Sequence, residues 1–279
     1  MRTIAELLQA AKKHGDSLGK AALAWQTAES GENEPFVIQH MEETLAVMRE
    51  SVRAGLSPTL RSASGMVGGQ AALMAESSQA SRFGILSKAA AYALSVAESN
   101  ACMGKIVAAP TAGSCGIVPG TLLAAQEEMG FSDQDMVMAL FACAAVGRVI
   151  AIAATISGAQ GGCQAECGAA AGMAAVALVQ LYGGTPQQAA DACAFALMNM
   201  LGLVCDPVHG LVEVPCVYRN AGGVSQALTS AQMALSGIRC PIPCDEMILI
   251  MKDVGDVLPP SLRETGEGGC GARGSWREG

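Results

Sequence analysis

Apolar residues recur at helical spacing along most of this chain, and that pattern limits its fold more than any other feature. The clearest stripe follows Pro35 and ends at Gly55. Its members are Val37, Met41, Leu45, Met48 and Val52. In contrast, no run of β-branched and aromatic residues alternates with polar ones for more than about five positions. Because the chain has only 2 Trp, 3 Tyr and 5 Phe residues, strand signals are scarce. We therefore predict an all-α protein.

Helix start and stop signals divide the pattern into elements. A hydroxyl residue followed by proline or an acidic residue predicts helix starts at Thr3, Ser132 and Thr185. The predicted helices are a short one from residue 4, then 35–54, 136–146, 186–201, 225–235 and 245–257. We predict three regions along the chain. They are an N-terminal helix and polar hinge (1–34), a compact multi-helix domain rich in Ala and Gly with ligand-bearing loops (35–263), and a Gly-rich irregular tail (264–279).

Composition and charge exclude several classes of protein. Of the 279 residues, 51% are hydrophobic and 15% are charged, so the chain can bury a large core and is not disordered as a whole. A net charge of −8 argues against neutralisation of phosphates, and we predict no nucleic-acid partner. The mean hydropathy is +0.35. However, the longest uncharged stretches, 149–165 and 167–190, are diluted by Gly, Gln, Ser and Thr, so we predict no membrane span.

The cysteines number 11, which is an odd count. No basic segment followed by an apolar one precedes them, so the sequence shows no secretory signal. A framework of disulfides in a secreted protein is therefore not expected. Reduced thiols or metal ligands in the cytoplasm are the better interpretation.

Residues 108–120 form the first segment that could carry chemistry. Two prolines, three glycines and two hydroxyl residues exclude a regular helix through this segment. Small residues let backbone N–H groups approach an anion, especially where a helix begins. Two interpretations stay open, namely a cradle for a carboxylate or phosphate and an ordinary interhelical loop.

Three further cysteines stand in unusual surroundings. Cys163 precedes Glu166 and Cys167, and the three residues share a face if this segment is helical. Cys205 and Cys216 each lie within two residues of a proline, where a loop could aim N–H donors at cluster sulfurs. Cysteine beside proline in a helix break recurs in iron–sulfur ligation. The spacing matches no compact zinc pattern, and packing of small buried thiols is the alternative.

Seven short blocks can be compared with known families. They are SGMVGG at 64–69, APTAGSCG at 109–116, GCQAE at 162–166, CDPV at 205–208, VPC at 214–216, RNA at 219–221 and LRET at 262–265. In order and spacing they resemble the α chain of bacterial iron–sulfur-dependent L-serine dehydratases, from about residue 45 to residue 269.

The resemblance implies an all-α catalytic domain that deaminates L-serine to pyruvate and ammonia in the cytoplasm, a reaction of serine catabolism and gluconeogenesis. It also implies a 4Fe–4S cluster held by Cys163, Cys205 and Cys216. Three thiolates leave one iron of the cluster without a protein thiolate. That iron can act as a Lewis acid on the serine hydroxyl.

Further site residues and a partner follow from the same resemblance. We predict that the substrate carboxylate is held by the loop of Thr111, Gly113, Ser114 and Gly116. Arg219 and Asn220 would make polar contacts beside the third cluster ligand. Single-chain members of the family carry a β domain with a histidine suspected as the base. This chain has no room for that domain, so we expect a separate β subunit that completes the site.

Two positions depart from the family's pattern. His209 stands shortly after Cys205, where a small residue is expected, so we predict a catalytic base at either His209 or a residue of the β chain. Cys270 stands in the tail, where the family usually has an apolar residue, and is a candidate for an additional cluster ligand.

Other functions stay open from the sequence. The same scaffold could act on L-cysteine as a desulfidase, or on another 3-substituted amino acid. A non-catalytic helical binding subunit would use the cysteines only for packing. Lys105 before the Gly-rich loop would suit a pyridoxal phosphate Schiff base, but the folds that hold this cofactor need parallel strands, which the sequence pattern does not predict.

Overall fold

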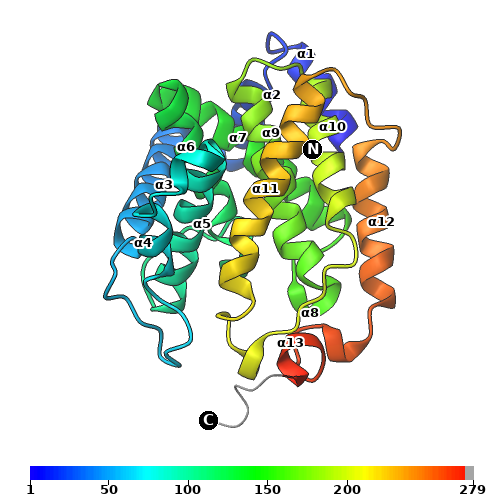
Figure 1. Ribbon diagram of the computed structural model, residues 1–279. Helices are drawn as coiled ribbons and strands as arrows, with labels where there is room; N and C mark the ends of the chain where they lie inside the picture. Colours follow the sequence, from blue (N-terminus) through cyan, green and yellow to red (C-terminus); the bar gives the residue numbers. More distant parts are fainter. Residues whose placement is uncertain (274–279) are drawn as a thin grey trace.

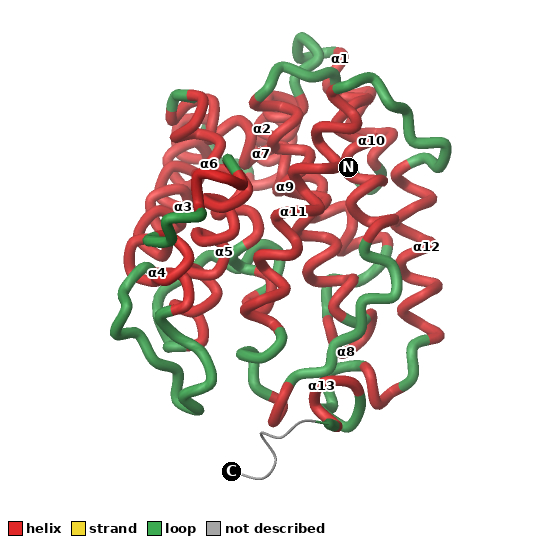
Figure 2. Tube along the Cα trace, in the orientation of Figure 1, coloured by secondary structure: helices red, strands yellow, loops and turns green. Residues whose placement is uncertain are grey.

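The computed structural model describes residues 1–273, apart from the side chains of residues 80 and 81. These residues form helices, helical turns and loops without a β-sheet (Figures 1 and 2). Within this part of the chain, the one β-type pairing is an isolated bridge between Cys205 and Arg263. The predicted all-α class is confirmed.

Helices follow one another along the described residues, joined by loops and short helical turns. The α-helices are α1 (Ile4–Lys12), α2 (Leu18–Ser30), α3 (Glu34–Gly55), α4 (Gln70–Ala75), α5 (Ile85–Ala101), α6 (Ile117–Met129), α7 (Asp133–Ala153), α8 (Gly158–Gly161), α9 (Ala169–Leu181), α10 (Pro186–Asn199), α11 (Cys216–Leu235), α12 (Cys244–Val257) and α13 (Gly269–Ala272). The shorter turns are η1 (Ala80–Phe83), η2 (Ala112–Ser114), η3 (Gln164–Gly168), η4 (Val208–Gly210) and η5 (Pro260–Leu262).

Helix α9 forms the centre of the molecule (Figure 1). All of its residues except Gln180 are buried. It packs against α6, α7, α10 and α11. Small residues permit this close packing, since a Cβ on Gly172 would lie only 3.0 Å from the Cys193 sulfur of α10. The high Ala and Gly content of the sequence therefore serves the close packing of helices around a buried core helix.

Most of the predicted helices are confirmed. Helices α3, α7, α10 and α12 cover the segments predicted from apolar periodicity. The Ser132 and Thr185 side chains each accept a hydrogen bond from the third helical residue, and both form complete capping boxes. The Thr3 hydroxyl accepts a hydrogen bond from the Glu6 N–H at the start of α1. Local capping chemistry thus placed these helix starts correctly.

Helix α11 corrects the prediction in the C-terminal half. The predicted helix began at residue 225, but α11 begins at Cys216 and includes Arg219 and Asn220. The predicted start lies just after the Gly222–Gly223 pair. The helix continues because Gly223 faces Ile117, whose Cδ1 would lie 2.3 Å from a Cβ at that position. Close packing against α6 therefore overrides the weak helix propensity of glycine.

The two chain ends also differ in part from the sequence prediction. Within the region predicted as an N-terminal helix and hinge, residues 26–30 belong to α2, and the break falls at Gly31, with φ of 72°. Leu7 and Leu18 lie in the same hydrophobic core as the main body, so α1 and α2 pack against it. The tail predicted as irregular contains α13, and its residues 274–279 lie outside the described part. The predicted domain boundaries remain a prediction.

Two helical stretches are long and apolar enough to cross a membrane, Asp133–Ala153 and Gln164–Leu181. Their apolar windows are 67% and 83% buried inside the protein. Core helices of this kind pass the same test as membrane helices, so we retain the prediction that the chain does not span a membrane.

Candidate active site

The segments singled out in the sequence meet at one end of the helix bundle. The turn η2 contacts both η3 and the start of α11, and α13 contacts η4. Figure 1 shows α8, α13 and the first turn of α11 together at this end, and Figure 2 shows that loops are concentrated there. Residues separated by more than a hundred positions are thus brought to one place.

Cys163 lies at the start of a π-helical turn. The turn η3 follows it directly and continues into α9. The Cys163 and Cys167 sulfurs are 3.3 Å apart, and both side chains are buried. The predicted shared face of these residues is therefore present, with π rather than α geometry. Single π turns inside α-helices occur frequently at functional sites.

Cys205 is held by the segment that follows α12. Its N–H donates to the Leu262 carbonyl at 2.9 Å, and its carbonyl accepts from the Glu264 N–H at 2.7 Å. These bonds flank the isolated parallel bridge to Arg263. The LRET block at 262–265 therefore fixes the backbone of this buried cysteine.

Cys216 is the first residue of α11, and Asn220 ties it to the Gly-rich loop. The Asn220 side chain accepts a hydrogen bond from the Gly116 N–H at 2.8 Å. Its amide NH₂ donates to the Gly113 and Cys216 carbonyls, both at 2.9 Å. Because Asn220 is 0% exposed, its amide joins the two segments within the protein interior.

The three predicted cluster ligands influence one another electrostatically. Burial raises the pKa of Cys205, and it raises that of Cys216 to about 12. The charge of Cys163 adds to both increases. The pKa of Cys163 itself is lowered, first by the hydrogen bond with Cys167 and then by the Arg219 guanidinium. A cationic neighbour favours the thiolate, which is the metal-binding form of cysteine.

Arg219 links these thiols to the loop that carries Cys205. Its guanidinium donates to the Val204 carbonyl at 2.8 Å and forms an ion pair with Asp206 at 2.7 Å. The Asp206 side chain is only 3% exposed. Since Cys163 also interacts with this guanidinium, Arg219 connects two of the predicted ligands.

Glu166 places a carboxylate among the predicted site residues. The Thr111 hydroxyl donates to its Oε1 at 2.7 Å, and the Ser114 hydroxyl lies 3.1 Å from that of Thr111. Desolvation raises the pKa of Glu166, with a smaller opposing effect from the Thr111 hydrogen bond. The loop residues Thr111, Gly113 and Ser114 therefore lie next to the Glu166 carboxyl group.

The structure places the remaining candidates at the edge of this site. His209 is exposed in η4 with φ of 54°, and Gly116 is a buried residue of the Gly-rich loop. The exposed Cys270 donates its N–H to the Asp206 carboxylate at 2.7 Å. Cys270 thus fastens the tail to the loop that follows Cys205.

Sequence reasoning missed the parts of the site that depend on contacts between distant segments. Asp206 lay inside the CDPV block, but nothing in the sequence indicated its pairing with Arg219. Gly158 lay outside every motif. A Cβ on it would lie 2.6 Å from the Glu166 Oε2 and 3.0 Å from the Cys205 sulfur. Only the fold shows that this glycine is needed for close approach.

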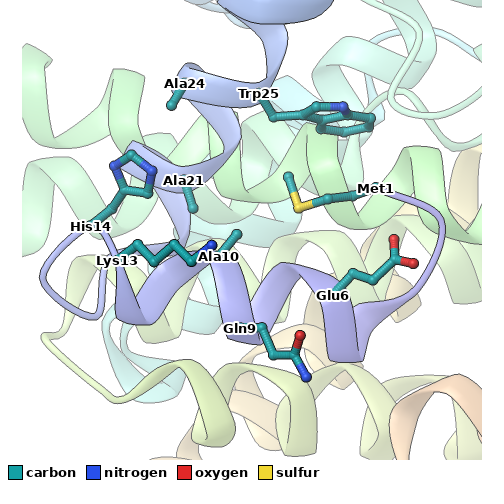
Figure 3. A pocket seen from close by; sticks show the side chains of 9 residues that line it. All are labelled: Met1, Glu6, Gln9, Ala10, Lys13, His14, Ala21, Ala24 and Trp25. Atoms are coloured by element: carbon teal, nitrogen blue, oxygen red, sulfur yellow. The ribbon is translucent and has the colours of Figure 1, made fainter.

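Two surface hollows differ in their position relative to this site. One of about 430 Å³ borders it and is lined by Arg219, Leu203 and Gly222 among others. A larger one of about 540 Å³ lies between α1 and α2, where Figure 3 shows Glu6, Lys13 and His14 among its lining residues. It shares no residue with the cysteine-rich end.

The described residues contain no group suited to a single metal ion. Within residues 1–273, no three His, Cys, Asp or Glu side chains lie close enough together to hold one ion. The buried cysteines at this end therefore do not form a compact mononuclear site of the zinc type.

Comparison with known proteins decides the family. Residues 4–271 match the family model described as "Serine dehydratase alpha chain". The chain belongs to the serine dehydratase alpha chain family. This confirms the resemblance found in the sequence, and the match covers every segment of the cysteine-rich site.

Three relatives illustrate the extent of the similarity. The "Probable L-serine dehydratase, alpha chain" of Bacillus subtilis (strain 168) is 45% identical over 99% of this chain and 93% of the relative. The "L-serine dehydratase, alpha chain" of Peptoniphilus asaccharolyticus is 40% identical over 96% of this chain and 93% of the relative. The "L-serine dehydratase" of Streptomyces coelicolor is 41% identical over 64% of this chain but only 40% of the relative.

Proposed function

We propose that this chain is the catalytic α subunit of an L-serine dehydratase, which converts L-serine to pyruvate and ammonia in the cytoplasm. The observation that carries the proposal is the meeting of Cys163, Cys205 and Cys216, all buried, at one end of the bundle. Family membership and the names of the relatives support the same reaction.

We propose that these three cysteines hold a 4Fe–4S cluster. Each cysteine of a cubane binds a different iron, so its ligands need not converge on one point as they do around a single ion. The donor set fits this group, because the three thiols are buried, lie near enough to act on one another electrostatically, and include Cys163, whose thiolate Arg219 favours. When bound, the cluster supplies a Lewis-acidic iron for the substrate hydroxyl.

The residues of the chain itself bind and orient the substrate in this proposal. The loop of Thr111, Gly113, Ser114 and Gly116 holds the substrate beside the cysteines, with Glu166 directly against it. Asn220 fixes that loop to the start of α11, while Arg219 fixes the Cys205 loop. The Asn220 and Arg219 side chains therefore position the site as well as border it.

Two groups must leave the substrate, a proton from Cα and hydroxide from Cβ. The resulting aminoacrylate tautomerises and is hydrolysed to pyruvate and ammonia without further help from the protein. We propose that a residue of the β subunit removes the Cα proton. The alternative base within this chain is His209. Because His209 is exposed, a β subunit docked at this end of the bundle could also reach the substrate.

The β subunit is also supported by two other observations. The relatives are named as alpha chains, which implies a second kind of chain in those proteins. In addition, Leu211 and Val212 are exposed by 40% and 38% between two proposed cluster ligands. Apolar side chains exposed beside a buried polar site are typical of a surface that a partner covers.

The product formed tests the proposed reaction. The protein is reconstituted anaerobically with iron and sulfide, mixed with the β chain, and given L-serine or L-cysteine. We expect pyruvate from L-serine with a kcat/KM at least about tenfold above that for L-cysteine. Faster release of sulfide from L-cysteine would support the desulfidase instead. Absence of either reaction, with the cluster bound, would support a non-catalytic subunit.

A further inference from the structure

We infer that Glu166 recognises the α-ammonium group of the amino-acid substrate. This inference rests on the proposed function. It adds an acidic group to the predicted substrate-binding residues, which are uncharged or basic. It follows from the position of the carboxylate, its hydrogen bonds and the charges around it.

The Glu166 carboxylate is fixed on one side only. The Thr111 hydroxyl donates to Oε1 at 2.7 Å, and the Ser114 hydroxyl lies 3.1 Å from the Thr111 oxygen. These contacts orient the carboxylate through Oε1. Within the described residues, no group donates a hydrogen bond to Oε2. Because Oε2 is also not among the fully buried polar atoms that lack a partner, it keeps some exposure. A donor can therefore approach Oε2.

Two glycines border the carboxylate where side chains would otherwise stand. A Cβ on Gly113 would lie 3.2 Å from Oε1, and a Cβ on Gly158 would lie 2.6 Å from Oε2. The same point beside Gly158 is 3.0 Å from the Cys205 sulfur. Oε2 and that sulfur are therefore no further apart than these two distances together. A carboxylate and a proposed cluster ligand thus adjoin the same small volume.

The spacing suits an amino acid with a hydroxyl on Cβ. In serine, two carbon atoms separate the hydroxyl oxygen from the ammonium nitrogen. A substrate whose hydroxyl lies at the cysteine cluster therefore carries its ammonium group within a few ångströms of that point. The Glu166 carboxylate lies beside the Cys205 sulfur, so it is placed to meet such an ammonium group.

The charge balance also favours a cationic group. Glu166 has a second acidic neighbour, Glu264, which acts electrostatically on both Glu166 and Cys205. Arg219 is the cation that acts on Cys163, and its guanidinium is already bonded to Asp206 and Val204. An ammonium ion at Oε2 would offset this excess of negative charge, and a charge-assisted hydrogen bond is among the stronger polar contacts.

The test uses Glu166→Gln in the reconstituted protein with its β chain. Glutamine keeps the size of the side chain and removes its charge. We expect the KM for L-serine to rise roughly 10- to 100-fold, as for loss of a charged hydrogen bond. The inhibition constant of 3-hydroxypropanoate, which keeps the hydroxyl and carboxylate but lacks the ammonium, should change less than about twofold. Iron content and visible absorbance should match those of the unmodified protein.

Glu267→Gln is the matched control, because it removes the same charge from the tail at this end of the bundle. The Glu267 side chain is exposed, so water and salt screen its effect, and we expect less than about a twofold change in either constant. If Glu166→Gln raised the KM for L-serine and the inhibition constant of 3-hydroxypropanoate equally, the inference would be overturned. A loss of kcat with both constants unchanged would also overturn it, since this result would indicate a base rather than a binding group.

The proposed function and the inference fail in different ways. If the unmodified protein forms no pyruvate from L-serine, the proposed reaction is wrong. L-serine and 3-hydroxypropanoate can then be titrated by calorimetry, since no turnover interferes. If Glu166→Gln weakened the binding of L-serine but not that of 3-hydroxypropanoate, the result would still support the inference. Equal effects on the two binding constants would contradict it.

Discussion

At the scale of single residues, Asp206 connects more parts of the site than any residue predicted from the sequence. One carboxylate oxygen pairs with Arg219 at 2.7 Å, and the other accepts the Cys270 N–H at 2.7 Å. Its carbonyl accepts the Gly271 N–H at 3.1 Å. A single buried aspartate next to Cys205 therefore joins α11, a proposed ligand loop and the tail.

We predict that Asp206→Ala lowers the free energy of unfolding by about 3 kcal/mol, since removal of one partner leaves a half-buried arginine without its counterion. Urea denaturation of the protein without iron measures this change. Asp256→Ala is the control, because its pair with Lys252 is exposed and should contribute little to stability. Equal losses for the two variants would contradict the role assigned to Asp206.

Gly158→Ala tests the close approach at the site. The added Cβ would lie 2.6 Å from Glu166 Oε2 and 3.0 Å from the Cys205 sulfur. We expect kcat/KM for L-serine to fall roughly 100-fold through displacement of these groups, while helical content stays unchanged. Gly222→Ala adds a methyl group where nothing lies within 4 Å, so it should keep full activity. Full activity of Gly158→Ala would show that the site tolerates this side chain.

At the scale of elements, capping and periodicity predicted the regular helices, and tertiary contacts decided the rest. Ser132 and Thr185 cap helices whose apolar stripes the sequence also displays. The early start of α11 was missed because it depends on the close packing of Gly223 against Ile117. The π turn at η3 was missed because no local residue preference distinguishes it from an α turn. Long-range packing, which one sequence does not display, controls both.

Arg49 of α3 and Asp133 at the start of α7 provide a pH-dependent contact between elements. The Arg49 hydrogen bond lowers the pKa of Asp133, so the pair stabilises the fold above the ordinary pKa of an aspartate. That contribution is lost as the pH falls through the lowered pKa. We expect Asp133→Asn to reduce stability at pH 7 by less than about 1 kcal/mol, because the pair is exposed. Urea denaturation should show that this difference disappears near pH 2. A difference that persists there would contradict an electrostatic origin.

At the scale of the whole molecule, the sequence predicted the fold class and the residues that would meet, but not how they are held. The resemblance to the family implied that Cys163, Cys205 and Cys216 belong together. The positions of Glu166 and Arg219 relative to those cysteines depend on how η3, α11 and the tail pack at one end of the bundle. That packing also creates the exposed surface around Leu211.

We predict that this surface binds the β subunit. Leu211→Asp should weaken association with the β chain at least about tenfold, since it places a charge in an apolar contact. Iron content should not change, because the Leu211 side chain is exposed. Sedimentation analysis of mixtures of the two chains measures the association. Leu249→Asp alters an exposed apolar residue of α12 as a control. Equal weakening by both variants would argue against a specific contact at Leu211.

Iron and sulfide analysis after anaerobic reconstitution tests the central claim most directly. We predict about four iron and four sulfide per chain in the unmodified protein, as in a cubane cluster. Cys205→Ser should lose most of both. Cys167→Ala should keep them, although its sulfur lies only 3.3 Å from that of Cys163. A Cys205→Ser variant with unchanged iron, or an iron-free Cys167→Ala variant, would contradict the proposed set of ligands.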